Sequence, residues 1–112
     1  GAEVVELAAP RGGLSIEAVL RALAARDVQS VLAEGGAAVH GSLIAAGLVD
    51  AVALFIAPVL LGGGVSIAAG LGRDLAHALA LGDLAWRPVG RDLLVTAERG
   101  TAERGPRNPS VL

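Results

Sequence analysis

The chain of 112 residues contains no cysteine and very few aromatic residues. Without cysteine it can form neither a disulfide bond nor a thiolate-ligated metal site. Aromatic residues make up only 2% of the sequence, so a hydrophobic core has to be built from alanine, leucine, valine and isoleucine. Hydrophobic residues reach 54%, which excludes disorder of the whole chain, and the length suits one small domain with one core.

Long hydrophobic runs and clusters of positive charge are also missing. The longest apolar run, residues 51–61, is interrupted by Pro58 and is too short to cross a bilayer. All 9 basic residues are scattered arginines and the net charge is −2, which argues against a nucleic-acid surface. No secretory leader opens the chain, so we expect a cytoplasmic protein that binds neither membrane nor nucleic acid. Because the chain does not begin with methionine, we expect it to be a fragment.

Hydrophobic periodicity predicts two helices. Residues 15–26 place apolar side chains at helical spacing, and Ser15 is suited to cap the first turn. Residues 37–46 predict a second helix, which ends at Gly47. Residues 74–81 fit either a short helix or an irregular crossing.

Four apolar runs predict strands. Residues 28–33 and 51–57 flank the second helix, and this order predicts parallel strands joined by a right-handed crossover. Residues 84–89 and 93–98 predict an antiparallel hairpin, in which Pro88 indicates an edge position or a bulge. The fold class is therefore α/β. In such sheets ligands bind beyond the carboxyl ends of the parallel strands.

The most informative stretch is residues 30–43, where an apolar run ends at Glu34 and two glycines lead into the second helix. Gly35 and Gly36 permit positive φ and leave no side chain over the first helical turn. The unpaired N–H groups of that turn, together with the helix dipole, attract phosphate. The stretch therefore predicts a site for a phosphorylated cofactor or substrate, although glycine pairs are also common at ordinary turns.

Several side chains near this turn have two interpretations. Glu34 either caps the helix or accepts hydrogen bonds from sugar hydroxyls, since a carboxylate that ends a buried strand needs a partner. Ser42 either donates to a phosphate or bonds back to its own helix. His40 has no neighbouring carboxylate or cysteine and is interpreted as structural. The glycines at 62–64 fit either a close approach by a cofactor or a flexible turn. We find no carboxylate pair, nucleophile triad or metal cluster.

Three blocks at matching spacing resemble the C-terminal reductase domain of the bifunctional riboflavin biosynthesis proteins. They are VLAEGGAAVHGS at 31–42, GLVD at 47–50 and IAPVLLGG at 56–63, and the run VGRDLLV at 89–95 is similar to the final hairpin of that domain. The resemblance extends from about residue 13 to residue 98. The sequence departs from the family at Val59, where the family usually has a lysine.

The resemblance implies a dihydrofolate-reductase-like mixed sheet flanked by helices. The activity that it implies is reduction of the ribosyl side chain of 5-amino-6-(5-phosphoribosylamino)uracil to the ribityl form, with NADPH as hydride donor. Glu34 would contact the phosphorylated pyrimidine substrate, and the following residues would line the NADPH phosphates. These cofactor-binding candidates are Gly35, Gly36, Ala37, Ala38, Val39, His40, Gly41 and Ser42. No catalytic residue and no metal ligand is assigned.

The resemblance also implies that the chain is incomplete. We expect residues 1–99 to be the C-terminal half of the reductase domain, residues 100–112 to be a disordered tail, and the complete protein to be a homodimer. An isolated half-site would be weakly active or inactive. Two alternatives remain open, which are a related reductase with another pterin or pyrimidine substrate and a non-catalytic module for binding or association.

Overall fold

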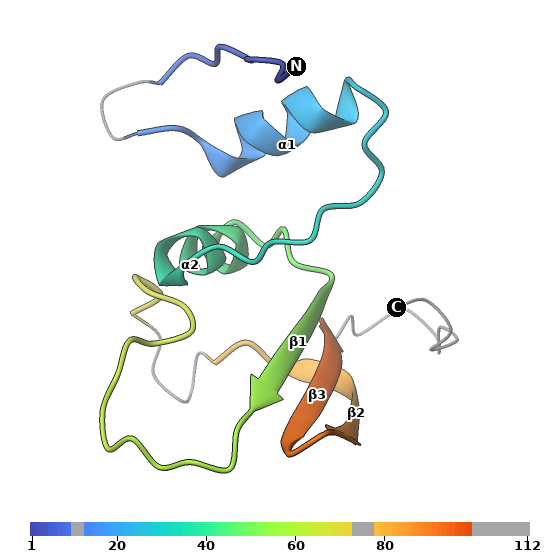
Figure 1. Cartoon of the computed structure of the whole chain (residues 1–112). Coiled ribbons are helices and arrows are strands. Elements are labelled where there is room, and N and C mark those ends of the chain that lie inside the picture. The colour runs from blue at the N-terminus through green and yellow to red at the C-terminus, as the bar shows by residue number, and fades with distance from the viewer. Residues whose placement is uncertain (10–12, 73–77, 100–112) are drawn as a thin grey trace. The chain divides into compact units, whose positions relative to one another are not determined.

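A computed structural model describes residues 1–9, 13–72 and 78–99 of the chain. These residues fall into two compact units, the first within Gly1–Leu48 and Gly63–Gly72 and the second within Val49–Gly62 and residues 78–99. The first unit contains helices α1 (Ile16–Ala24) and α2 (Ala37–Ala45), and the second contains strands β1 (Ala51–Ile56), β2 (Leu81–Val89) and β3 (Asp92–Arg99) (Figure 1). The predicted tail, residues 100–112, lies outside the described residues.

Helix α1 confirms the prediction from its capping residue and periodicity. Ser15 is extended, and its hydroxyl accepts a hydrogen bond of 3.3 Å from the Ala18 N–H. The same hydroxyl donates to the carboxylate of Glu17, and this hydrogen bond is the main cause that lowers the pKa of Glu17 below its ordinary value of 4.5. After the helix Asp27 adopts φ +60°, and the Val28 N–H donates to the Leu23 carbonyl, which ends the helix.

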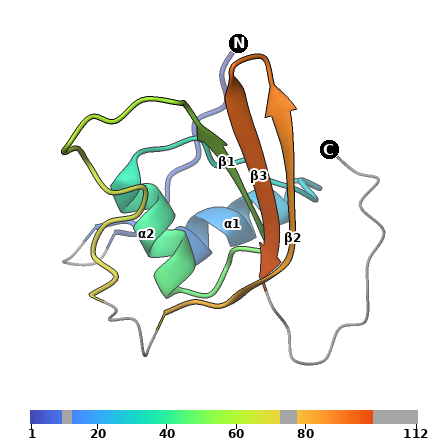
Figure 2. The ribbon, with the colours of Figure 1, turned by 90° about the horizontal axis from the view of Figure 1, so that it is seen from below.

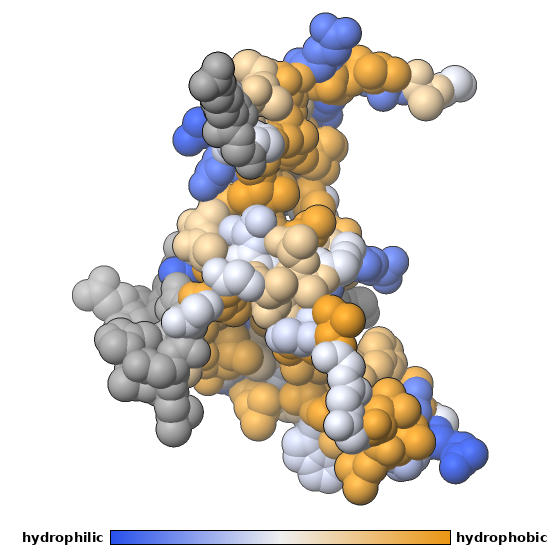
Figure 3. Space-filling model, turned by 90° about the vertical axis from the view of Figure 1, so that its left-hand side faces the viewer, coloured by the Kyte–Doolittle hydropathy of each residue, from blue (hydrophilic) through white to orange (hydrophobic). Residues whose placement is uncertain are grey.

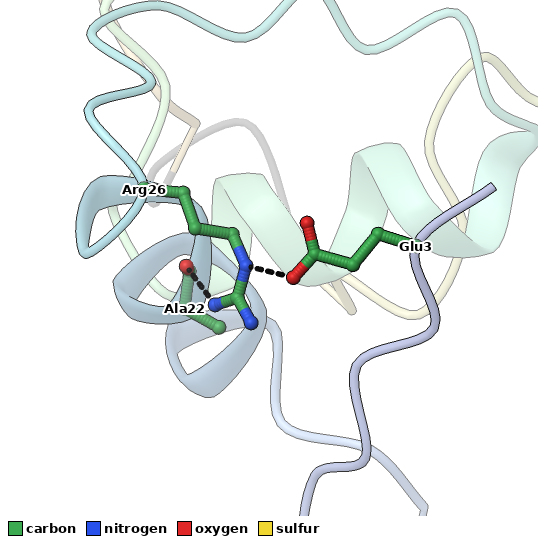
Figure 4. Close-up of polar contacts among 3 residues, drawn as sticks. All are labelled: Glu3, Ala22 and Arg26. Carbon is green, nitrogen blue, oxygen red and sulfur yellow. Dashed lines mark hydrogen bonds and ion pairs between the residues drawn. The ribbon is translucent and has the colours of Figure 1, made fainter. Parts of the chain in front are cut away.

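The arginine at the end of α1 holds the N-terminal segment of the same unit. Arg26 donates from Nε to Oε1 of Glu3 at 2.9 Å and from Nη1 to the carbonyl of Ala22 at 2.9 Å (Figure 4). Both charged side chains are well exposed to solvent, at 40% for Arg26 and 69% for Glu3. An exposed pair of this kind contributes at most about 1 kcal/mol to stability, so it orients the segment more than it stabilises the unit.

The predicted strand at 28–33 does not form. The segment has no regular structure, and its apolar side chains are exposed, at 52% for Val31 and 80% for Leu32. A strand is stabilised by backbone hydrogen bonds to a neighbouring strand, and within the described residues β1 pairs with β3 instead. The predicted parallel pairing across α2 is therefore wrong.

The second unit is a three-stranded sheet of order β1–β3–β2, with both neighbouring pairs antiparallel. Figure 2 shows β3 between the other two strands. The predicted hairpin is confirmed: β2 and β3 are joined by the two-residue turn Gly90–Arg91, in which Gly90 has φ +60°. A mixed sheet was expected, but the described sheet is wholly antiparallel.

Pro88 lies in β2, which is an edge strand and carries a register shift between Gly82 and Ala85. Its position confirms the edge placement that proline requires, because proline has no N–H to donate. The region 74–81 can be compared only in part, since residues 73–77 lie outside the described residues and Leu81 already begins β2.

One face of the sheet is mainly apolar, with the charged Arg99 at its end. Side chains opposite each other in the register share a face and alternate along each strand. The register therefore groups on one face Val52, Leu54, Ile56, Leu93, Val95, Ala97, Trp86 and Pro88. Trp86 is 68% exposed and Ile56 is 51% exposed. Among the described residues of this sheet, only Leu94 and Ala97 are buried hydrophobic residues. The space-filling view of the chain shows hydrophobic residues on its surface (Figure 3).

Candidate functional site

The turn that leads into α2 is open where a ligand is expected. Gly36 is the N-cap, with φ −72° and ψ 176°, and Gly35 also lacks a positive φ. The positive φ that glycine permits is therefore used at neither position, because an extended N-cap already turns the chain into the helix. A Cβ at Gly36 would meet nothing within 4 Å, whereas one at Gly35 would lie 3.1 Å from Cβ of Val39. The absence of a side chain at Gly36 keeps the helix terminus accessible.

The first turn of α2 has no side-chain cap and no acidic residue. The Gly36 carbonyl accepts hydrogen bonds from the N–H groups of Val39 at 3.0 Å and His40 at 3.2 Å, and the helix begins there. The N–H groups of Ala37 and Ala38 belong to the first turn, where a helix offers no internal carbonyl partner. Such donors, together with the helix dipole, favour an anion at this end of α2.

Glu34 stands two residues before the N-cap and is exposed to solvent. It was expected at the end of a buried strand, but that strand does not form, so its carboxylate carries no burial cost. Within the part of the chain that the structure describes, Glu34 makes no hydrogen bond or ion pair, and the structure does not show it capping α2. The carboxylate is therefore available to an external partner.

A segment distant in sequence lies against the same end of α2. Residues 66–69, here the 66–69 segment, belong to the same unit as the helix (Figures 1 and 2). The Ala69 N–H donates to the Ala37 carbonyl at 2.8 Å. The approach of the Ala69 carbonyl oxygen to Gly41 is so close that a Cβ on Gly41 would lie 1.8 Å from it. A glycine inside a helix normally costs stability, and here it admits the 66–69 segment to the helix surface.

His40 connects this segment to the chain that precedes the turn. Its Nδ1 lies 2.9 Å from the Ile67 carbonyl oxygen, and its Nε2 lies 3.2 Å from the Ala33 carbonyl oxygen. A neutral imidazole can donate to only one of these acceptors, whereas the imidazolium donates to both. The structural interpretation of His40 therefore has a specific basis in two backbone contacts.

The remaining predicted residues lie further along the helix. Ser42 Oγ donates to the Ala38 carbonyl at 2.9 Å, so its hydroxyl bonds back to its own helix. Val39 is 42% exposed, while Gly41 is buried beneath Ala69. The predicted set therefore divides between an open terminus at Gly36 and a helix surface at Gly41 that the 66–69 segment covers. The participation of this segment was not predicted. The signal that was missed is Gly41, a glycine in the middle of a predicted helix.

The second unit contains a cavity of about 300 Å³ at the end of β1. It is lined by Ala57, Pro58, Val59, Arg91 and Asp92, so residues after β1 and the hairpin turn form its walls.

No metal-binding group of three or more histidine, cysteine or acidic side chains occurs among the described residues. The described helices are also too short or too polar to span a membrane.

Comparison with known proteins gives a family for this chain. Residues 2–95 match the family described as RibD C-terminal domain. The chain is also 46% identical over 50 residues to the riboflavin biosynthesis protein RibD of Bacillus amyloliquefaciens. That alignment covers 45% of this chain and 14% of the relative, so it spans about a seventh of the relative's length. The match over most of its length shows that the chain belongs to the RibD C-terminal domain family.

Proposed function

We propose that this chain is part of a reductase of riboflavin biosynthesis, and that it helps to bind NADPH for reduction of 5-amino-6-(5-phosphoribosylamino)uracil. Reduction converts the ribosyl side chain of this substrate into a ribityl chain. The observation that carries the proposal is the family match over residues 2–95. The open N-terminus of α2, which lies within the matched range, supports it.

The residues at α2 suit the phosphates of a dinucleotide. The N–H groups of Ala37 and Ala38 lie in an uncapped first turn, and the space beside Gly36 is open. An anion placed there would meet donors and the positive end of the dipole without displacing a carboxylate. NADPH, when bound, supplies the hydride, and the role proposed for this chain is to hold its phosphates in position.

Glu34 is proposed to bind the substrate, because its exposed carboxylate can accept hydrogen bonds from sugar hydroxyls. We expect Glu34→Ala to raise KM for the pyrimidine substrate more than KM for NADPH in the active reductase. Steady-state kinetics with each reactant varied in turn would measure both values. Glu34→Gln is the matched control, because it retains an acceptor oxygen and removes the charge. A larger effect on KM for NADPH would assign Glu34 to the cofactor instead.

We further propose that residues 1–99 form part of a dihydrofolate-reductase-like domain, which is a homodimer in the complete protein. The apolar sheet face supports this proposal, because Trp86 and Ile56 are largely exposed on it and further structure is needed to cover them. Within the described sheet β1 is an edge strand, and such an edge offers backbone groups for an additional strand. The same features would also favour the alternative of a non-catalytic module for association.

Titration of the chain with NADPH, followed by calorimetry, tests the proposed function. Nicotinamide riboside is the control, because it retains the nicotinamide and one ribose but carries no phosphate. We expect binding of NADPH and none of the riboside, with little or no turnover of the pyrimidine. If NADPH binds neither this chain nor a longer protein that contains it, the association module becomes the better explanation. Turnover of a pterin in place of the ribosylaminouracil would favour a related reductase.

A further inference from the structure

The His40 side chain links two separate parts of the first unit. The ring reaches two backbone carbonyl oxygens that are distant in sequence, those of Ala33 before the glycine turn and Ile67 in the 66–69 segment. We infer that His40 is a positioning residue that fixes the 66–69 segment across the first turn of α2. The segment then forms one wall of the phosphate site, a step that rests on the proposed function.

The 66–69 segment needs such an anchor because its flanks are made of glycine. Gly62 and Gly64 before it, and Gly70 and Gly72 after it, all have positive φ. Glycine-rich flanks have many accessible conformations, so the position of the segment has to be set by its contacts. Its contacts with α2 are the hydrogen bond from the Ala69 N–H to Ala37, the close approach to Gly41 and the His40 ring.

Of these three contacts, only that of His40 is made by a side chain. The bond between Ala69 and Ala37 joins two backbone groups, and Gly41 contributes only an empty space. Substitution at His40 therefore removes the anchor while the backbone partners remain. Because Ala37 both accepts from the segment and contributes an N–H to the first turn, a displaced segment would alter the surroundings of the proposed site.

Two conservative variants separate the two ring contacts. The amide nitrogen of asparagine occupies about the position of Nδ1, so His40→Asn retains a donor toward Ile67. The amide nitrogen of glutamine reaches about as far as Nε2, so His40→Gln retains a donor toward Ala33. His40→Leu retains bulk and removes both donors. Arg26→Ala is the matched control, because it breaks a side-chain contact in the same unit without touching the segment.

The measurement is amide hydrogen exchange of the Ala69 N–H by NMR in the full chain. We expect exchange of Ala69 to be about fivefold faster in His40→Leu and His40→Gln, which corresponds to one net hydrogen bond. His40→Asn and Arg26→Ala should remain within about twofold of the wild type. Amides of the central strand β3 report whether each variant is folded. Unchanged Ala69 exchange in a folded His40→Leu variant, or equal effects of asparagine and glutamine, would overturn the inference.

Titration of the same variants with NADPH tests the link to the site. We expect the affinity to fall in His40→Leu and His40→Gln and to be restored in His40→Asn, in parallel with Ala69 exchange. If the wild type does not bind NADPH, the proposed function fails while the exchange data still decide the role of His40. If the wild type binds and exchange changes without any change in affinity, the segment is not a wall of the site.

Discussion

Replacing Gly36 by aspartate should change helix stability and cofactor binding in opposite directions. Gly36 already has an extended N-cap conformation, with φ −72° and ψ 176°, and a Cβ there would meet nothing within 4 Å. Aspartate can therefore enter without strain. Its carboxylate would accept hydrogen bonds from the first turn of α2, which has no side-chain cap in the wild type. The same groups are those proposed to bind the cofactor phosphate.

The sizes of both effects follow from this geometry. Aspartate is a better N-cap than glycine by a few tenths of a kcal/mol, and its charge adds about 0.3–1 kcal/mol through the helix dipole. The free energy of unfolding should therefore rise by about 0.5–1.5 kcal/mol. Against a phosphate about 5 Å away, an effective dielectric constant of about 20–80 gives a repulsion of about 1–3 kcal/mol per unit charge. The affinity for NADPH should fall by about 5-fold to 150-fold.

Urea unfolding and NADPH calorimetry measure the two quantities on the same protein. Gly36→Asn is the matched control, because asparagine caps equally well but carries no charge. We expect the asparagine variant to be stabilised while retaining much more of its affinity, and the loss in the aspartate variant to shrink as salt is added. If aspartate stabilises α2 and leaves NADPH binding unchanged, no phosphate lies at this terminus and the proposed site is refuted. Equal losses in both variants would indicate steric exclusion.

Two further predictions concern local contacts in the first unit. Gly41→Ala improves helix propensity but places a Cβ 1.8 Å from the Ala69 carbonyl oxygen, so the 66–69 segment has to move. We expect faster amide exchange in that segment. Gly63→Ala is the control and should not change this exchange, because a Cβ at Gly63 meets nothing within 4 Å. Ser15→Ala should raise the pKa of Glu17 toward its ordinary value, because the hydrogen bond from Ser15 is the main cause of its depression. An NMR titration of the Glu17 carboxyl measures this shift. The stability that this hydrogen bond contributes is present above the unfolded pKa of Glu17 and is lost as pH falls through the lower folded pKa. We therefore expect the free energy of unfolding to fall less over this pH range in the Ser15→Ala variant than in the wild type.

Features that depend on neighbours in the sequence were predictable. Ser15 caps α1, apolar spacing sets its length, and Gly47 adopts φ +71° at the end of α2. The turn at Gly90 joins strands only two residues apart, so the hairpin was also within reach of local reasoning. Each of these features is decided by backbone geometry and hydrogen bonds within a few residues.

Strand pairing could not be obtained in the same way. Residues 28–33 have the composition of a buried strand, yet composition does not say which strand will supply the hydrogen bonds. The partner of β1 is β3, about 40 positions later, where Leu54 pairs with Val95 and Phe55 with Leu94. An apolar run without alternation fits several neighbours equally well, so the choice depends on the whole sheet.

The candidate site follows the same division between local and distant contacts. An uncapped helix start after two glycines is a local feature, and the sequence was sufficient to predict an open terminus at Gly36. The 66–69 segment reaches α2 from about 30 residues away, and its Ala69 backbone meets the helix where Gly41 has no side chain. A glycine inside a helix costs about 1 kcal/mol relative to alanine, so its presence at a buried position is itself evidence that another segment packs there. A glycine at position 41 of a predicted helix therefore indicates a covering segment, although the identity of that segment depends on the fold.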